Sequence, residues 1–159
     1  MIRIVDADTP ERIGLAQMMF AEYAGTPDVD VCVADYAKEV EGLPGRYAPP
    51  AGALLIAIEH DQPLGCVVLR ALDPPYSEMK RLYVRADARG RGVGEMLVLE
   101  LAKRARAAGY AAMRLDTLAS MTTAQALYRR LGFRVIPPYP KKPIPGATHY
   151  ELTLSEPAP

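Results

Sequence analysis

The chain has 159 residues and half of them are apolar, which is the size and composition of one globular domain with a sizeable core. Its net charge is zero and it has no stretch of 18 apolar residues, so neither nucleic-acid binding nor a membrane span is indicated. The two histidines argue against a zinc site, and the isolated Cys32 and Cys66, without a secretion signal before them, favour a reduced protein in the cytoplasm.

The beginning of the chain predicts one strand followed by two helices. Residues 2–5 form a short β-branched run that is typical of a strand. Thr9 can cap a helix that starts at Pro10, and apolar residues then recur at helical spacing until Gly25. Residues 33–42 predict a second helix, which is more polar.

Three strands follow. Residues 53–59 and 63–72 are apolar runs on either side of a short turn, which predicts a hairpin. Residues 73–77 break the chain, and residues 78–84 predict a third strand. Strict alternation along that strand would place two sets of side chains on opposite faces: Met79, Arg81 and Tyr83 on one, and Lys80, Leu82 and Val84 on the other.

Helices and strands alternate in the second half. Residues 93–108 predict a long helix with Gly109 after its last turn, and residues 111–119 predict a strand. A right-handed crossover through the helix makes this strand parallel to strand 78–84. Residues 121–131 predict another helix.

Two short strands are predicted at the end of the chain, over residues 133–136 and 148–154. Residues 137–146 between them contain five prolines, which we interpret as a stiff, ordered loop. The order of elements predicts a single mixed α/β domain over residues 1–159.

A glycine-rich loop connects strand 78–84 to the long helix, and this arrangement is a general anion site. A P-loop is excluded because Gly94 is followed by glutamate and methionine instead of lysine and a hydroxyl residue. A dinucleotide site is a weaker alternative. Gly90 and Gly92 fit its pattern and Asp116 lies at a suitable distance, but Glu95 occupies the third glycine position.

Two motifs together are more specific than the glycines alone. The sequence RGRGVG of residues 89–94 resembles the Q/R-x-x-G-x-G/A signature of the GNAT family of N-acetyltransferases. The sequence AQALYRRLGF of residues 124–133 resembles the second hallmark of that family, A-x-x-L-Y-x-x-x-G-F. The order of predicted elements also fits, so the resemblance covers essentially the whole chain.

The resemblance implies a fold and a cosubstrate. The fold is a mixed, mostly antiparallel, twisted sheet with a central pair of parallel strands that splay apart, flanked by about four helices. The cosubstrate is acetyl-CoA, with its pyrophosphate on the backbone amides of the glycine loop and its pantetheine arm along strand 78–84. The implied binding residues are Leu82, Tyr83, Val84, Arg89, Gly90, Arg91, Gly92, Val93, Gly94, Met121 and Ala124.

Met121 stands where many family members have asparagine, and a thioether can pack there but cannot replace the amide's hydrogen bonds. The family motif makes Tyr128 the general acid, or the hydrogen-bond donor to the CoA sulfur, although a core tyrosine would occupy the same helical face. Glu78, eleven residues before Arg89, is the candidate base, and an apolar cleft would raise its pKa. Asp116, Tyr139 and water are the alternatives.

The cues on the acceptor conflict. Residues 1–45 hold nine acidic and three basic residues, whereas residues 78–114 hold four acidic and nine basic ones. In the resembled family the first two helices line the acceptor side, which favours a small cationic amine or a peptide or lysine amine. Lys141 and Lys142, in the proline-rich loop, would instead attract a carboxylate. The acidic residues concerned are Glu22, Asp28, Asp30, Asp35, Glu39 and Glu41.

We therefore predict an N-acetyltransferase that joins acetyl-CoA and a primary amine in a ternary complex, with direct attack and without a metal. A homodimer is compatible with the resemblance. The alternative from another class is a non-catalytic module that binds or senses acyl-CoA, because the glycine loop suits both. Tyr128 and Glu78 favour catalysis.

Overall fold

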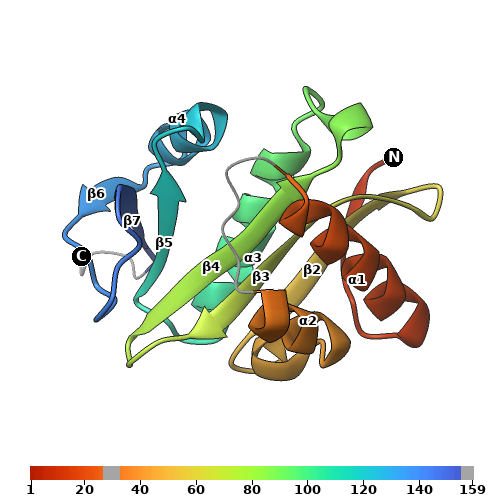
Figure 1. The fold of residues 1–159 in the computed structure, drawn as a ribbon, viewed down its shortest axis with the longest axis horizontal. Helices are drawn as coiled ribbons and strands as arrows, with labels where there is room; N and C mark the ends of the chain where they lie inside the picture. Colours follow the sequence, from red (N-terminus) through yellow and green to blue (C-terminus); the bar gives the residue numbers. More distant parts are fainter. Residues whose placement is uncertain (27–32, 155–159) are drawn as a thin grey trace.

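The structure is a computed structural model, and it describes residues 1–26 and 33–154. Its strands form one seven-stranded sheet in the order β1-β2-β3-β4-β5-β7-β6 (Figure 1). The strands are β1 Arg3–Asp6, β2 Ala53–Glu59, β3 Gln62–Ala71, β4 Tyr76–Val84, β5 Ala112–Leu118, β6 Arg134–Ile136 and β7 Ala147–Thr153. The helices are α1 Pro10–Ala24, α2 Val33–Glu41, α3 Val93–Ala107 and α4 Thr122–Arg130, with single 3-10 turns at Gly45–Tyr47 and Ala86–Ala88.

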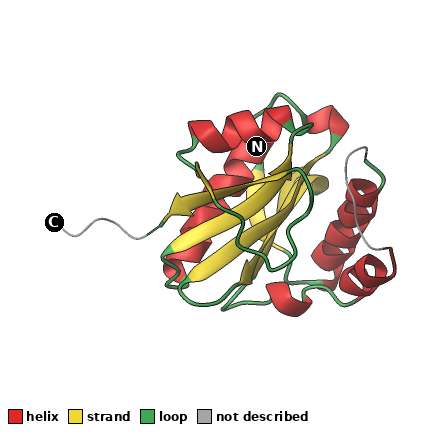
Figure 2. Cartoon of the chain, turned by 60° about the vertical axis from the view of Figure 1, so that its left-hand side comes forward, coloured by secondary structure: helices red, strands yellow, loops and turns green. Residues whose placement is uncertain are grey.

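Helices cover both faces of the sheet (Figure 2). On β2, alternate side chains enter two separate clusters, because successive residues of a strand point to opposite faces. Leu55 belongs to the cluster beneath α3 and α4, and Ile56 to the cluster beneath α1 and α2. The largest fully buried side chains include Met19 and Phe20 of α1 and Leu97 and Leu101 of α3. The sheet therefore has an apolar layer on each face.

Local signals fix most of the elements where the sequence places them. Thr9 accepts a hydrogen bond from the backbone amide of Arg12 and so caps α1, as predicted. The predicted hairpin is confirmed, and the φ angles of His60 and Asp61 at its turn are 50° and 63°, as a two-residue turn of the mirror-image type requires. The last strand begins at Ala147, where Gly146 adopts a positive φ of 78°.

Strand β4 differs from the prediction in two ways. It begins at Tyr76, so the break predicted over residues 73–77 is two residues too long. Its predicted alternation is also wrong, because β3 advances by two residues between Cys66 and Val68 while β4 advances by three between Tyr83 and Lys80. The extra residue is a bulge at Arg81, whose φ is 59°. As a result Met79 shares the α3 face with Leu82 and Val84 instead of sharing a face with Arg81 and Tyr83.

Strands β4 and β5 form the only parallel pair of the described sheet, and they separate soon after they meet. Their ladder consists of Tyr76 with Ala112, Ser77 with Met113 and Glu78 with Arg114. The predicted sheet, with four helices and a splayed central parallel pair, is confirmed. Beyond Glu78 and Arg114 the two strands diverge, which opens the sheet in its middle (Figure 1).

Candidate active site

A groove of about 700 Å³ runs from the open end of β4, past the glycine-rich loop, to the start of α4. The groove is lined by ten of the eleven residues that the sequence assigned to cosubstrate binding. These are Leu82, Tyr83, Val84, Arg89, Gly90, Gly92, Val93, Gly94, Met121 and Ala124. Residues from two regions that are distant in sequence, 82–94 and 121–124, thus form one continuous surface.

The glycine loop presents backbone amides to this groove. Gly90 and Gly92 have φ angles of 80° and 77°, in the left-handed region that an L side chain rarely adopts. Gly92 is also the N-cap of α3, and the first hydrogen bond within this helix runs from the Met96 amide to the Gly92 carbonyl. The amides of Val93 and Gly94 precede that bond, so they remain available to an anion at the positive end of the helix dipole.

The two arginines of the loop have different surroundings. Arg89 lines the groove, and its Nε donates to the Val84 carbonyl over 3.3 Å. Arg91 does not line the groove, because its guanidinium lies 2.9 Å from both carboxylate oxygens of Glu59. The sequence named both arginines, but the structure brings only the Arg89 side chain to the site.

A second cavity, of about 150 Å³, occupies the opening between β4 and β5, and we call it the central cavity. Tyr128 lines it from α4, with its ring packed between Phe133 and Tyr150 at centroid distances of 5.4 and 6.0 Å. The Tyr128 hydroxyl forms none of the side-chain hydrogen bonds found among the described residues, and burial raises the pKa of this tyrosine. It is therefore a protonated, unengaged donor at neutral pH, inside the opening that joins the two faces of the sheet.

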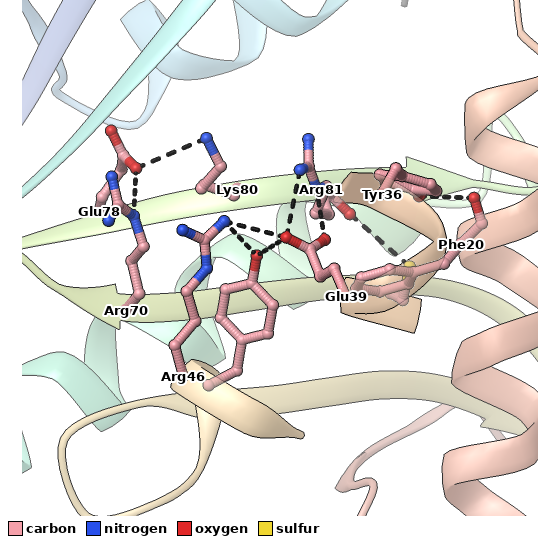
Figure 3. A network of polar contacts seen from close by, with 10 residues as sticks. Phe20, Tyr36, Glu39, Arg46, Arg70, Glu78, Lys80 and Arg81 are labelled. Carbon is pink, nitrogen blue, oxygen red and sulfur yellow. Dashed lines mark hydrogen bonds and ion pairs between the residues drawn. The ribbon is translucent and has the colours of Figure 1, made fainter. Parts of the chain in front are cut away.

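Glu78 has a more crowded environment than the sequence suggests (Figure 3). It is 3% exposed, and its Oε1 accepts from Arg70 Nε over 2.7 Å while its Oε2 accepts from the Tyr139 hydroxyl over 2.5 Å. Lys80 Nζ lies 3.7 Å from Oε1. Burial alone would raise the pKa of Glu78, but Lys80, Tyr139 and Arg70 together hold it below its ordinary value. The expected rise is wrong, because the cleft at this point is lined by cations and not by apolar groups.

Tyr139 and Asp116, the alternative candidates for the base, differ in whether their oxygen atoms are already hydrogen-bonded. The Tyr139 hydroxyl is already committed to Glu78, and burial raises the pKa of Tyr139. Asp116 lines the central cavity, and it forms no side-chain hydrogen bond or ion pair with any residue of the described ranges. Asp116 is thus the carboxylate with free acceptor atoms at the cavity.

The acidic excess of the first two helices is partly neutralised. Glu22 accepts from the Tyr83 hydroxyl over 2.9 Å and pairs with Arg85 over 3.1 Å. Glu39 pairs with Arg81 over 3.0 Å and with Arg46 over 2.9 Å (Figure 3). Asp35 and Glu41 are exposed on α2, whereas Asp28 and Asp30, like Cys32, lie outside the described residues. Because several of these carboxylates already have partners, the acidic excess supports a cationic acceptor less strongly in the folded protein than in the sequence.

Sequence reasoning missed Lys80, which lines the central cavity from β4. The alignment of β4 with β5 would have identified Lys80, but the sequence alone does not give the pairing of these two strands. Cys66 is a buried free thiol. In residues 1–26 and 33–154 no group of three or more potential ligands is arranged for a metal ion, and no helix is both long and apolar enough to cross a bilayer.

Comparison with known proteins yields one consistent match. The model of the acetyltransferase (GNAT) family matches residues 17–133. An uncharacterized N-acetyltransferase of Schizosaccharomyces pombe is 34% identical, over 98% of this chain and 96% of its own length. An acetyltransferase structure from Staphylococcus aureus superposes with a TM-score of 0.82 at 19% identity, over 98% and 100% of the two chains. YncA of Salmonella typhimurium, determined with its cofactor acetyl-CoA, superposes with a TM-score of 0.76 at 20% identity, over 99% and 96%.

Proposed function

The chain belongs to the GNAT family and is an acetyl-CoA-dependent acetyltransferase, and on this premise we propose that it transfers the acetyl group directly to a primary amine in a ternary complex. The observation that carries the proposal is Tyr128, which lines the opening between β4 and β5 and whose hydroxyl forms no hydrogen bond with another described residue. The dinucleotide alternative is not retained, because the family match accounts for the same glycine loop.

Acetyl-CoA supplies an acetyl group activated as a thioester, and the groove has the features that such a molecule requires. The amides of Val93 and Gly94 and the Arg89 guanidinium suit the two phosphates. The edge of β4 that faces β5 has no strand partner beyond Glu78, which suits a pantetheine arm that hydrogen-bonds along Leu82–Val84. Both features support the binding residues named from the sequence, apart from the Arg91 side chain.

Tyr128 has the role of proton donor to the departing sulfur. The N–C bond forms as the C–S bond breaks, and the electron pair of that bond leaves with the sulfur. A phenol that burial keeps protonated can donate to this thiolate and regain a proton from the nitrogen of the product. The packing of its ring against Phe133 and Tyr150 holds the hydroxyl in place.

The amine must also lose a proton before it attacks. Both carboxylate oxygens of Glu78 are already hydrogen-bonded, to Arg70 and Tyr139, so the geometry supports a role for Glu78 in holding its neighbours better than a role as the base. Asp116 lines the cavity without a described partner and is better placed to accept this proton.

Steady-state kinetics with both substrates varied test this proposal against a non-catalytic acyl-CoA-binding module. The wild-type protein is incubated with acetyl-CoA and a panel of polyamines, amino acids, aminoglycosides and peptides while thiol release is followed. A ternary complex gives intersecting reciprocal plots, and protein mass after incubation with acetyl-CoA alone stays unchanged. Parallel plots with an acetylated protein would overturn direct transfer. Tight binding of acetyl-CoA with no acetylated product from any amine would favour the binding module.

A further inference from the structure

Lys80 and Asp116 line the central cavity from its two sides, one on β4 and the other on β5. The last rung of the β4–β5 ladder joins Glu78 to Arg114, and each of the two residues lies two positions further along its strand. Side chains two apart on a strand point to the same face. If the two strands had stayed paired, Lys80 and Asp116 would therefore lie opposite each other, two residues beyond the last rung and on the same face of the sheet.

The divergence of the strands leaves these two charges apart. No ion pair joins Lys80 to Asp116, and Asp116 has no other charged partner in the described ranges. The ion-pair partner of Lys80 is Glu78 at 3.7 Å, which is longer than the 2.7 Å between Glu78 and Arg70. Since Arg70 and Tyr139 already occupy Glu78, the Lys80 charge is only partly balanced.

The cavity thus presents a cation and an anion on opposite walls. Partly buried charges are costly unless each meets an opposite charge. A molecule that carries both an ammonium and a carboxylate satisfies both walls at once, whereas a plain cation leaves Lys80 unbalanced. The volume of about 150 Å³ suits a small acceptor, and Tyr23 and Ile144 add less polar surface for its remaining atoms.

We propose that the acceptor is a small amino-carboxylate, an amino acid or a compound with the same two groups, whose carboxylate binds Lys80 and whose amine lies at Asp116. This inference rests on the proposed function and names its substrate class. The amine would then stand next to the group that accepts its proton and within the same cavity as the Tyr128 hydroxyl. Lys80 acts here as a specificity-determining residue.

The test compares each amino acid with its own primary amide, which keeps the side chain and the ammonium but has no carboxylate. The wild-type protein should acetylate its best amino acid with a kcat/KM about 10- to 100-fold above that of the matching amide, the range expected for one hydrogen-bonded charge pair. Lys80→Met should abolish most of this ratio through the KM of the amino acid, and Lys80→Arg should retain part of it. Lys103→Met, which removes an exposed charge on α3, should leave the ratio unchanged.

Equal rates for amino acids and amides, or an unchanged ratio in Lys80→Met, would overturn the inference. Turnover of amides or polyamines without turnover of amino acids would refute the carboxylate site and leave the proposed acetyltransfer intact. If acetyl-CoA binds and no amine of any class consumes it, the proposed function fails as well. Binding of acetyl-CoA by Lys80→Met, measured by calorimetry, shows that the variant is folded.

Discussion

Arg89 and Arg91 are separated by a single glycine, yet only Arg89 faces the cosubstrate groove, because Arg91 is paired with Glu59 at 2.9 Å. We therefore predict that Arg89→Gln raises the Kd for CoA by about 10-fold, the loss of roughly one charge-assisted hydrogen bond. Arg91→Gln should change that Kd by less than about 2-fold, because an exposed ion pair contributes little.

Isothermal titration at two salt concentrations checks this difference. The effect of Arg89→Gln should shrink at high salt, since ions screen exposed charges. Equal losses of affinity in both variants would mean that the side-chain directions in the loop do not govern phosphate binding.

Gly92 and Gly109 offer a matched pair for the role of the loop backbone. Both have positive φ angles, 77° and 91°, and an added Cβ would meet no atom within 4 Å at either position. Alanine at either site should therefore lower the free energy of unfolding by about 1 to 2 kcal/mol through backbone strain alone. Only Gly92→Ala should also weaken CoA binding, because Gly109 lies beyond the other end of α3. Urea denaturation and titration with CoA measure the two effects separately.

Tyr128→Phe isolates the hydroxyl from the ring. The ring packing is retained, so we expect kcat to fall by about 100-fold while the KM for acetyl-CoA changes little. Tyr110→Phe is the control, because its hydroxyl donates to the Ala51 carbonyl and neither residue lines the cavity. A kcat for Tyr128→Phe within 2-fold of the control would remove the proposed acid from the mechanism.

Asp116→Asn and Glu78→Gln distinguish the two candidate bases. We expect kcat to decrease by about 100-fold in Asp116→Asn, and by a smaller factor in Glu78→Gln, because only Asp116 lines the cavity with free oxygens. Rapid-quench measurement of the first turnover removes product release from the comparison. The reverse order of the two decreases would restore Glu78 as the base, as the sequence predicts.

Glu78 should instead contribute to stability, with a defined pH dependence. Its pKa in the folded protein lies below the ordinary 4.5, so folding favours the ionised form. Its contribution is therefore fully present above the unfolded pKa and is lost as the pH falls through the lower, folded value. Glu78→Gln should cost about 3 kcal/mol at pH 7, as for a broken buried ion pair, and progressively less below pH 4.5.

Urea denaturation across this pH range provides the measurement. Glu100→Gln, which removes a partly exposed pair with Arg104 on α3, should cost no more than about 1 kcal/mol at pH 7. A destabilisation by Glu78→Gln that is independent of pH would show that side-chain packing, and not its charge, is what the protein loses.

Much of the fold could be predicted from the sequence because the signals are local. Thr9 at the start of α1, the hairpin turn at His60 and the glycine at position 92 each fix a boundary through backbone geometry or a single hydrogen bond. The bulge at Arg81 could not be predicted, because the mismatch between β3 and β4 becomes apparent only when both strands are aligned. Because of this one extra residue, Met79 lies on the opposite face of the sheet from the residues with which strict alternation groups it.

The site could be predicted to a different extent on its two sides. The groove follows from motifs that are contiguous in the chain, such as the loop from Arg89 to Gly94. The central cavity depends on how β4 and β5 diverge and on which cations gather at Glu78, and these are tertiary properties. This is why the pKa of Glu78 was expected to move in the wrong direction and why Lys80 was missed.

The short ladder between β4 and β5 also has a mechanical consequence. The two strands form a wedge that is closed at the three paired rungs and open towards Val84. The Ser77 hydroxyl donates to the Ala112 carbonyl over 3.0 Å, so a side-chain hydrogen bond stabilises the closed end in addition to the three rungs. Val84 lies six residues beyond the last rung, at most about 20 Å along the strand, because the bulge at Arg81 shortens it. A rotation of about 5° at the closed end would therefore shift the open end by nearly 2 Å. Substitutions at Ser77 should therefore change the affinity for CoA, whose pantetheine arm we propose to lie along Leu82–Val84, without any direct contact between Ser77 and CoA.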